Sequence, residues 1–445
     1  MRPQRKNYFK LIIETRMSKR TAFPKVFWTA NLIEVLERFA YYGIYMGFGI
    51  YLQQLGYEKS DLGIIQSVFL GISYLIPLFS GTFADRYGFK KVLIISYLAY
   101  LPSILLLIVT KTFSGIALTM LSIGFAAGIF KPLISATVRA TTDSTNKTLG
   151  FGIFYAMVNL GASFGPIIMG KLRAMSWDYV FYTAAAIISL MFVITLFFYK
   201  EPAREIEGAT LKSKFIDMGE ALSDYKFLLF IFLLGIFFWM PFWAFFNTLA
   251  VYINDYLDNA QLYLSVKAML GETVANFIST NTNGVWKINA EAISHTGYII
   301  ILFQVVISWF FEKRAAISSF LLGLVIAASG FVLLGLSVSF NNNLVFLGVF
   351  LFAMGEMISS PRIQEYIMWI APKEKAGLYM GTNFLAVFIG AVLSGLYTGL
   401  MGRFEEASHP EYIMYTLALH TLLGILAIWI FTKTMGEFKE RKELA

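Results

Sequence analysis

Long apolar stretches alternate with short polar ones along almost the whole chain. Each apolar stretch holds roughly 20 residues, enough to cross a hydrocarbon layer ~30 Å thick as a helix, and they recur from Val26 to Lys433. Backbone N–H and C=O groups in lipid must form their hydrogen bonds within the chain, as they do in helices and closed β-barrels. These stretches lack the alternation of apolar and polar residues that barrel strands show, so we predict helices. The twelve predicted spans are residues 26–53, 62–84, 91–109, 113–138, 149–171, 178–199, 227–254, 294–312, 315–338, 343–371, 377–400 and 411–432.

The composition fits a chain whose solvent is lipid. Of the 445 residues, 57% are hydrophobic and 14% are charged, which leaves too little polar surface for a soluble domain of this size. The chain has no cysteine, which excludes disulfides and thiolate metal sites, and we expect no metal and no cofactor. The segment before Val26 is polar and basic, without the apolar run of a cleaved signal peptide.

The distribution of basic residues predicts the orientation in the membrane. Of the 36 Lys and Arg residues, 26 fall on the side of the two termini, seven fall on the opposite side and three lie inside predicted spans. By the positive-inside rule, both termini are cytoplasmic and the protein is a multi-pass protein of the cell (inner) membrane. This asymmetry also explains the net charge of +8 without a nucleic-acid partner. Polyanion binding is the weaker alternative, through the tail residues Arg2, Arg5, Lys6 and Lys10.

The longest cytoplasmic connection divides the spans into six plus six. This arrangement, with both ends inside, is similar to that of the major facilitator superfamily, whose two halves enclose a central substrate cavity. We therefore predict an all-α integral membrane protein with this fold, present as a monomer. The predicted parts are a cytoplasmic tail (1–25), an N-terminal bundle (26–200), a linker (201–226), a C-terminal bundle (227–433) with an extracellular loop (255–293), and a second tail (434–445). We expect this loop to be a solvated cap with some helix between Ala260 and Ala275.

Charged residues inside the first predicted span are the first functional candidates. A charge at membrane depth is costly unless it is paired or faces a cavity. Helical spacing places five polar residues on one broad face, which we expect to line the cavity. These residues are Glu34, Glu37, Arg38, Tyr41 and Tyr45. The alternative is a purely structural ion-pair set.

Further charges lie inside later spans. Lys131 stands beside Pro132, and its charge and that of Arg38 offset Glu34 and Glu37. A proton or an anionic substrate would change which pairs form in such a balanced set, as coupling requires. Glu356 has no cation in its own turn, so a substrate ammonium would suit it. The alternatives are a Lys131 that reaches the interface and a Glu356 that is a neutral packing carboxyl.

Two smaller features carry structural predictions. Arg362 and Glu365 are three residues apart near the cytoplasmic end, where a structural or gating pair is favoured over substrate contact. The three histidines lie at or near predicted helix ends, where we expect surface roles; they are His295, His409 and His420.

The loop between the second and third spans resembles the cytoplasmic signature of the superfamily. It reads Gly81-Thr82-Phe83-Ala84-Asp85-Arg86-Tyr87-Gly88-Phe89-Lys90-Lys91. Gly81 and Gly88 would allow a tight turn, Asp85 could bond at a neighbouring helix N-terminus, and Arg86 would help to hold the loop inside. We expect this motif to act in gating, and the alternative is an ordinary basic loop.

Four ordered motifs resemble those of the proton-coupled oligopeptide transporter (POT) family, and together they cover most of the chain. The first is Glu34-Val35-Leu36-Glu37-Arg38-Phe39-Ala40-Tyr41-Tyr42-Gly43, and the second is Gly128-Ile129-Phe130-Lys131-Pro132. The third is Phe154-Tyr155-Ala156-Met157-Val158-Asn159-Leu160-Gly161, and the fourth is Gly355-Glu356-Met357 with Pro361 and Ala371-Pro372.

This resemblance implies proton-coupled import of di- and tripeptides by alternating access. Arg38 and Lys131 would bind the peptide carboxylate, and Asn159 and Glu356 the amino end. The candidate substrate-binding residues are Arg38, Tyr41, Tyr42, Tyr45, Lys131, Asn159, Asn247 and Glu356. The candidate proton-coupling residues are Glu34, Glu37, Arg38 and Lys131.

The chain departs from the family at several positions. Tyr45 stands where the family has a second Arg, and Asn247 stands where its seventh helix has a Glu. Leu133 replaces the usual Asn after Lys-Pro, and the extra helix pair common in bacterial members is absent. Losing one Arg and one Glu together keeps the charge balance but removes a salt bridge between the halves on the extracellular side.

These departures leave other functions open. One is a divergent member that moves a drug, a lipid or a non-peptide metabolite, including as a proton antiporter. Another is a membrane receptor that binds without transporting. The chain has no His or Cys metal spacing, no phosphate-cradling loop after a strand and no nucleophile motif in a suitable context, so we do not expect an enzyme.

Overall fold

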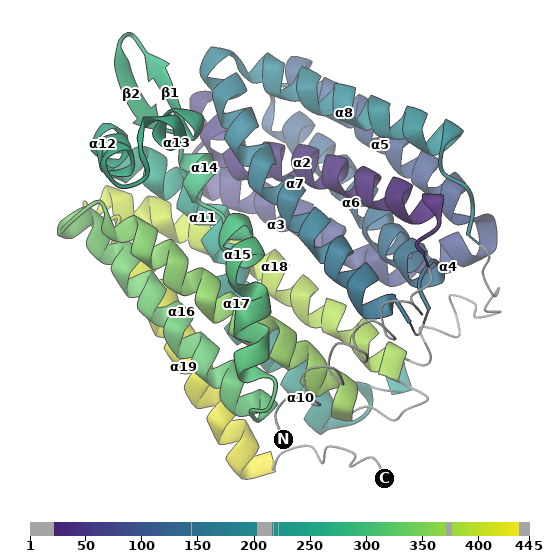
Figure 1. Ribbon diagram of the computed structural model, residues 1–445. Helices are drawn as coiled ribbons and strands as arrows, with labels where there is room; N and C mark the ends of the chain where they lie inside the picture. Colours follow the sequence, from purple (N-terminus) through teal and green to yellow (C-terminus); the bar gives the residue numbers. More distant parts are fainter. Residues whose placement is uncertain are drawn as a thin grey trace, which may run out of the picture.

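The structure is a computed structural model, and it describes residues 22–143, 145–202, 216, 218–220, 222–370 and 376–435. Its helices form two groups, one made of α2 to α8 and the other of α10 to α19 (Figure 1). Most of the predicted linker, most of both predicted tails and all of the Ala371-Pro372 pair lie outside the described residues.

The first group contains seven helices that form six spans. They are α2 (Lys25–Gln54), α3 (Lys59–Leu75), α4 (Pro77–Tyr87), α5 (Phe89–Val109), α6 (Phe113–Ala140), α7 (Lys147–Met175) and α8 (Trp177–Phe197). α3 and α4 were expected as one straight span and are instead bent by 41° where Pro77 begins α4. Proline has no N–H to donate and its ring crowds the preceding turn, which explains the bend.

The second group also forms six spans. It contains α10 (Tyr225–Leu234), the π-helical segment η1 (Gly235–Trp239), α11 (Met240–Tyr256), α15 (Gly297–Phe311), α16 (Ala316–Ser339), α17 (Leu344–Ile370), α18 (Ala376–Glu406) and α19 (Tyr412–Met435). The sequence prediction did not include the π-helical segment in the seventh span. There Gly390 of α18 packs so closely on Trp239 that a side chain would clash.

The described residues include ten helices that are long and apolar enough to cross a membrane, and the bent pair α3–α4 is an eleventh span. α2 is not one of these ten. It is 30 residues long, enough to cross a membrane, but the charged residues Glu34, Glu37 and Arg38 lower its hydropathy. Counting α2, the structure has the twelve predicted spans. The chain is a multi-pass membrane protein with the predicted all-α fold.

We call the end of the bundle that carries the α4–α5 connection the inner end, and the opposite end the outer end. The outer end carries the outer cap, residues 259–293, seen at the upper left of Figure 1. The cap consists of α12 (Asn259–Leu270), α13 (Glu272–Phe277), β1 (Ser279–Thr282), β2 (Val285–Ile288) and α14 (Ala290–Ile293). β1 and β2 pair antiparallel as a hairpin.

The expected helix in this loop is present as α12 and α13, but the hairpin was not predicted. The expectation of a wholly solvated cap is wrong at its inner side. Glu291 of α14 is 1% exposed and forms an ion pair with Arg173 of α7. The ammonium of Lys171, also in α7, donates to the carbonyl of Asn276 at 2.8 Å. The cap therefore joins the two groups of helices at the outer end.

Glycines allow α2 and α7 to pack closely in the first group. A Cβ at Gly161 of α7 would lie 2.7 Å from the Cβ of Arg38 and 3.0 Å from the amide nitrogen of Phe39. A Cβ at Gly43 of α2 would clash with Met169. Two of the family-like motifs thus meet at this contact, which fixes the helix face that carries the charges.

Candidate functional site

Glu34, Glu37 and Arg38 of α2 form one buried ion-pair set, which we call the first-helix cluster. The Arg38 Nε lies 2.8 Å from Glu34 Oε1 and 3.1 Å from Glu37 Oε2. The Tyr100 hydroxyl of α5 donates to Glu37 Oε1 at 2.6 Å. Arg38 is 5% exposed and both carboxylates are less exposed. Two buried carboxylates around one cation carry a net charge of −1, and desolvation makes this excess charge costly unless a proton or a second cation balances it.

Lys131 of α6 supplies a second cation next to this cluster. Its Nζ lies 4.9 Å from the ring centroid of Tyr41 and 4.1 Å from that of Tyr74. The ammonium is buried and has no hydrogen-bond partner among the described residues. The alternative of a lysine that reaches the membrane interface is therefore wrong. Two aromatic faces stabilise the charge but accept none of its three protons by hydrogen bonds, so an anion can still bind there.

The second group contributes a carboxylate to the same region. Glu356 of α17 accepts a hydrogen bond from the Thr296 hydroxyl at 2.8 Å. Gly297, the next residue, begins α15 against α7, where a Cβ would lie 3.3 Å from the carbonyl oxygen of Asn159. Asn159 and Glu356 thus approach the same helix start, as their expected joint role requires. The side chain of Asn159 donates to the carbonyl of Tyr155.

Tyr42 is close enough to both charged regions to interact electrostatically with Arg38 and with Glu356. Tyr155 of α7 also interacts with Glu356. These two tyrosines therefore link the first-helix cluster and Glu356 electrostatically. Tyr74, Tyr100 and Thr296 were not singled out from sequence, because nothing in their local pattern marks them, and Tyr155 was named only as part of the third motif.

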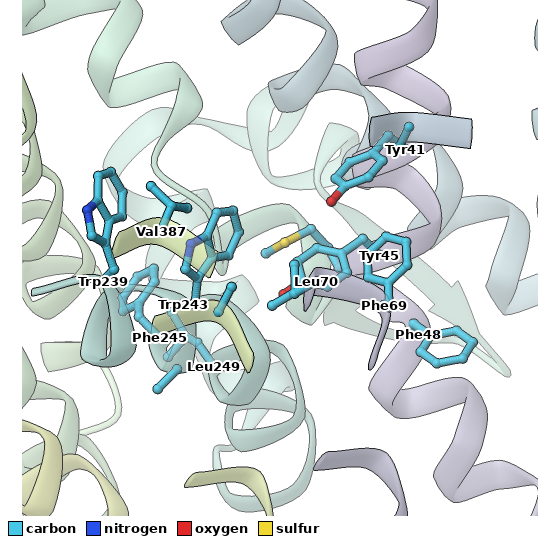
Figure 2. Packing of buried hydrophobic residues seen from close by; sticks show 14 of the residues in the cluster. Tyr41, Tyr45, Phe48, Phe69, Leu70, Trp239, Trp243, Phe245, Leu249 and Val387 are labelled. Atoms are coloured by element: carbon cyan, nitrogen blue, oxygen red, sulfur yellow. The ribbon is translucent and has the colours of Figure 1, made fainter. Parts of the chain in front are cut away.

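Aromatic side chains from both groups line the region around this site. In Figure 2, Tyr41, Tyr45 and Phe69 lie on the right and Trp239 and Trp243 on the left, with further apolar side chains between them. The ring centroids of Tyr74 and Trp243 are 5.1 Å apart. The indole N–H groups of Trp239 and Trp243 are buried and have no partner among the described residues. Trp243, which packs on Tyr74 as Lys131 does, is an additional hydrogen-bond donor in this region.

Tyr45 and Asn247 contact each other across the two groups. The Tyr45 hydroxyl of α2 donates to Asn247 Oδ1 of α11, and Asn247 Nδ2 donates to the Ser394 hydroxyl of α18 at 2.8 Å. Gln66 of α3 donates to the Asn247 carbonyl at 2.9 Å and accepts from the Thr398 hydroxyl at 2.7 Å. All five side chains are buried. We call Tyr45, Gln66, Asn247, Ser394 and Thr398 the outer latch.

The outer latch occupies the two positions where the family-like pattern loses an Arg and a Glu. An uncharged hydrogen bond joins the groups at these positions. Ion pairs lie further toward the outer end, where Lys59 of α3 contacts Asp255 at 3.1 Å and Glu405 at 2.6 Å. With the ion pair between Arg173 and Glu291, these contacts connect the first group to the second at several points. A direct substrate contact by Tyr45 or Asn247 stays a prediction.

The gating motif lies at the inner end, between α4 and α5. Gly88 ends α4 with a φ of +100°, which favours glycine, so the expected turn role is present. Gly81 lies inside α4 with open space around it, so the expectation that it forms the turn is wrong. Asp85 and Arg86 lie in the last turn of α4. The backbone N–H groups of Phe89 and Lys90, at the start of α5, donate hydrogen bonds to the carboxylate of Glu201, which was not singled out from sequence.

The remaining candidates are divided between structural and surface positions. Arg362 donates to Glu365 at 2.5 Å and to the carbonyl of Arg314, which agrees with the favoured structural or gating pair. His409 is exposed, as expected. His295 is 3% exposed, and His420 is half-buried and bonded to Tyr397, so the surface prediction is wrong for both. His295 lies at a helix start, as predicted, but is buried there against the ring of Tyr298.

The chain is similar in sequence to known transporters. The sequence model of the Major Facilitator Superfamily matches residues 31–395. The quinolone resistance protein NorA of Staphylococcus aureus is 29% identical over 168 residues, which are 36% of this chain and 43% of NorA. The match thus spans less than half of that relative. The uncharacterized MFS-type transporter YttB of Bacillus subtilis (strain 168) is 22% identical over 394 residues, 88% of this chain and 91% of YttB.

Solved structures share the fold over nearly the whole chain. A POT family transporter in complex with 5-aminolevulinic acid superposes with a TM-score of 0.74 at 20% identity, covering 93% of this chain and 97% of that one. The nucleoside transporter NupG superposes with a TM-score of 0.72 at 13% identity, covering 91% and 99%. At such identities the likeness shows the arrangement of helices.

Proposed function

Because the chain belongs to the Major Facilitator Superfamily and is a membrane transporter of that type, we propose that it is a proton-coupled symporter of di- and tripeptides or related zwitterions. The inner end faces the cytoplasm in this proposal, in agreement with the distribution of Lys and Arg. The observation that carries it is the ammonium of Lys131, which is buried beside the first-helix cluster and has no hydrogen-bond partner in the part of the chain that the structure describes.

The substrate carboxylate binds at Lys131 and Arg38. The Lys131 ammonium lies over the rings of Tyr41 and Tyr74 and has no hydrogen bond among the described residues, so a carboxylate gains charge-assisted hydrogen bonds without breaking one seen there. Arg38 is already paired with Glu34 and Glu37, and can turn to the substrate only if one carboxylate is neutralised. A proton on either glutamate does this, which links proton binding to substrate binding.

The substrate amino group binds at Glu356. Glu356 has one hydrogen bond, from Thr296, and among the described residues no cation forms an ion pair with it. A substrate ammonium balances this carboxylate at the opposite end of the site. POT family transporters of similar structure have been solved with a conjugated peptide and with 5-aminolevulinic acid, which supports an amino-acid-like substrate.

Alternating access then requires opening of the outer latch and of the outer ion pairs. The halves contact at the outer end through Tyr45 and Asn247, and through Lys59 with Asp255 and Glu405. Loading from outside separates these contacts, and the halves rock about the site. Because the contact between Tyr45 and Asn247 is uncharged, the proton acts at the first-helix cluster and not at this latch.

The test combines one variant with matched ligands in proteoliposomes with an acidic exterior. Dialanine should accumulate, and Lys131→Ala should abolish accumulation. In a thermal-shift assay, Lys131→Ala should weaken dialanine binding but leave the already weak binding of its C-terminal amide unchanged. Lys267→Ala, an exposed residue of the outer cap, is the control. Gradient-independent uptake, or equal loss for both ligands, contradicts the proposal.

A second candidate function is proton-driven export of an apolar or cationic solute. It is favoured by the match to NorA, whose name is that of a quinolone resistance protein, and by the aromatic residues in Figure 2. Export would appear as uptake into inside-out vesicles driven by an acidic interior. If quinolones or dyes, and not dipeptides, respond to the gradient in this way, this function replaces the first.

A further inference from the structure

A groove lies on the side of the first group, between α4, α5 and α6, away from the first-helix cluster. Its volume is about 400 Å³, within the range of roughly 300–1,000 Å³ for small-molecule sites. Phe79, Phe83 and Tyr87 line it from α4, Val92 and Ile95 from α5, and Phe125 from α6. The hydroxyl of Ser80, which also lines it, donates to the carbonyl of Gly128. We call it the side groove, and it offers almost only apolar surface.

The side groove opens toward the bilayer. Phe83 is 45% exposed, Tyr87 51% and Ile95 52%. α5 is one of the apolar membrane-spanning helices, so exposed apolar residues along it face hydrocarbon. The occupant must therefore be apolar along its length and available within the membrane. An acyl chain has both properties.

The bend of the second span creates this space. α4 turns by 41° relative to α3 at Pro77. Ile76, at the bend, packs against α6 so closely that a Cβ on Gly128 would lie 2.7 Å from it. Ile76 lines the side groove together with Phe79, Phe83 and Tyr87, which follow the bend. The bent segment thus supplies one wall of the side groove.

Basic residues stand at the inner mouth of the side groove. The Arg86 guanidinium lies 5.4 Å from the ring centroid of Tyr87, and Arg86 is exposed. Lys91 is exposed and lies one turn before Ile95 on the same face of α5. Lys90, by contrast, donates to the carbonyl of Leu196 at 2.8 Å. Arg86 and Lys91 are therefore the cations that an anionic group at this membrane surface can reach.

We propose that the side groove binds an anionic phospholipid of the inner leaflet. One acyl chain lies along Phe79, Phe83 and Ile95, and the phosphate lies at Arg86 and Lys91. Basic residues next to a membrane surface attract anionic headgroups. The side groove is continuous with the lipid-facing surface, so an acyl chain can enter it from the bilayer. The bound lipid joins α4 to α5 and α6 and holds the connection that carries the gating motif. This site is independent of the substrate that the transporter moves.

Two double variants separate specific binding from general solvation by lipid. Purified protein is titrated with phosphatidylglycerol or with phosphatidylcholine of the same chains, and thermal unfolding is followed. We expect a saturable rise in Tm with phosphatidylglycerol that exceeds the rise with phosphatidylcholine. In Arg86→Gln/Lys91→Gln, the half-saturating concentration should rise roughly 30-fold. Arg139→Gln/Lys147→Gln, exposed at the same end, is the matched control and should behave as the parent protein.

A variant that fills the side groove tests the position of the acyl chain. Ile95→Trp should remove the response to phosphatidylglycerol, whereas Leu98→Trp should keep it, because Leu98 is 61% exposed on α5 but does not line the side groove. In native mass spectrometry, Ile95→Trp should retain one bound lipid fewer than the parent protein. Equal stabilisation by both lipids, an equal response to inorganic phosphate, or an unchanged response in Ile95→Trp overturns the proposal.

Discussion

Asn247→Leu should destabilise the state in which the outer end is closed. Asn247 Oδ1 accepts the hydroxyl of Tyr45 across the two groups, whereas its Nδ2 is bonded to Ser394 within the second group. When the halves separate, the Tyr45 hydroxyl reaches water. When they are closed in the variant, it is buried without a partner. The variant therefore penalises the closed state selectively.

The size of this penalty follows from the burial of the contact. Tyr45 is 4% and Asn247 2% exposed, and leaving a buried donor unpaired costs about 1–3 kcal/mol. A coupling of this size changes an equilibrium by roughly 5–150-fold. If the closed form is in excess by about 100-fold, the variant populates both forms.

Spin labels can measure this shift, because the chain has no native cysteine. Single cysteines at Ser114 in the first turn of α6 and at Ala407, just after α18, lie exposed at the outer end of each half. We expect Asn247→Leu to increase the population with a long distance between the labels. Asn254→Leu, exposed on the same helix, is the control. An unchanged distance distribution in Asn247→Leu would refute the latch.

Three further predictions concern the site and its packing. Glu37→Gln, which replaces the partner of Tyr100, should abolish proton-driven accumulation but preserve substrate exchange without a gradient; loss of both would argue for a binding role instead. Glu356→Gln should lower affinity at least tenfold for dialanine and little for N-acetyl-alanine, measured by competition, and equal losses would count against an amine contact. Gly161→Val should cost about 1–3 kcal/mol by overpacking α2 and lower the Tm, whereas Gly152→Ala in the same helix, with open space around it, should not. Equal Tm values for these two variants would contradict the packing account.

The spans could be predicted because lipid imposes a simple rule on length and polarity. The first span was expected at 26–53 and runs over Lys25–Gln54, and the tenth was expected at 343–371 and runs over Leu344–Ile370. The bend at Pro77 and the π-helical segment could not be placed, since apolar content does not report how a helix packs. The hairpin had a signal in Asn283-Gly284, a pair that favours tight hairpin turns, but its short strands lack strong alternation.

The site was partly predictable for a similar reason. Glu34, Glu37 and Arg38 lie within two turns of one helix, so their contact follows from helical spacing alone. Contacts between distant helices depend on their relative height and rotation, which no pattern in one helix reveals. The sequence therefore marked Tyr45 and Asn247 as departures, but could not predict that they bond to each other. The same holds for Thr296 with Glu356 and for the burial of His295.

The central claim is that substrate and protons move together in one direction, and proton flux tests it most directly. Proteoliposomes that contain a pH-sensitive dye, with no initial pH gradient and a clamped membrane potential, receive dialanine outside. We predict that the interior acidifies, and that it does not acidify with Lys131→Ala. Alkalinisation on substrate addition, or uptake without any pH change, would contradict proton symport.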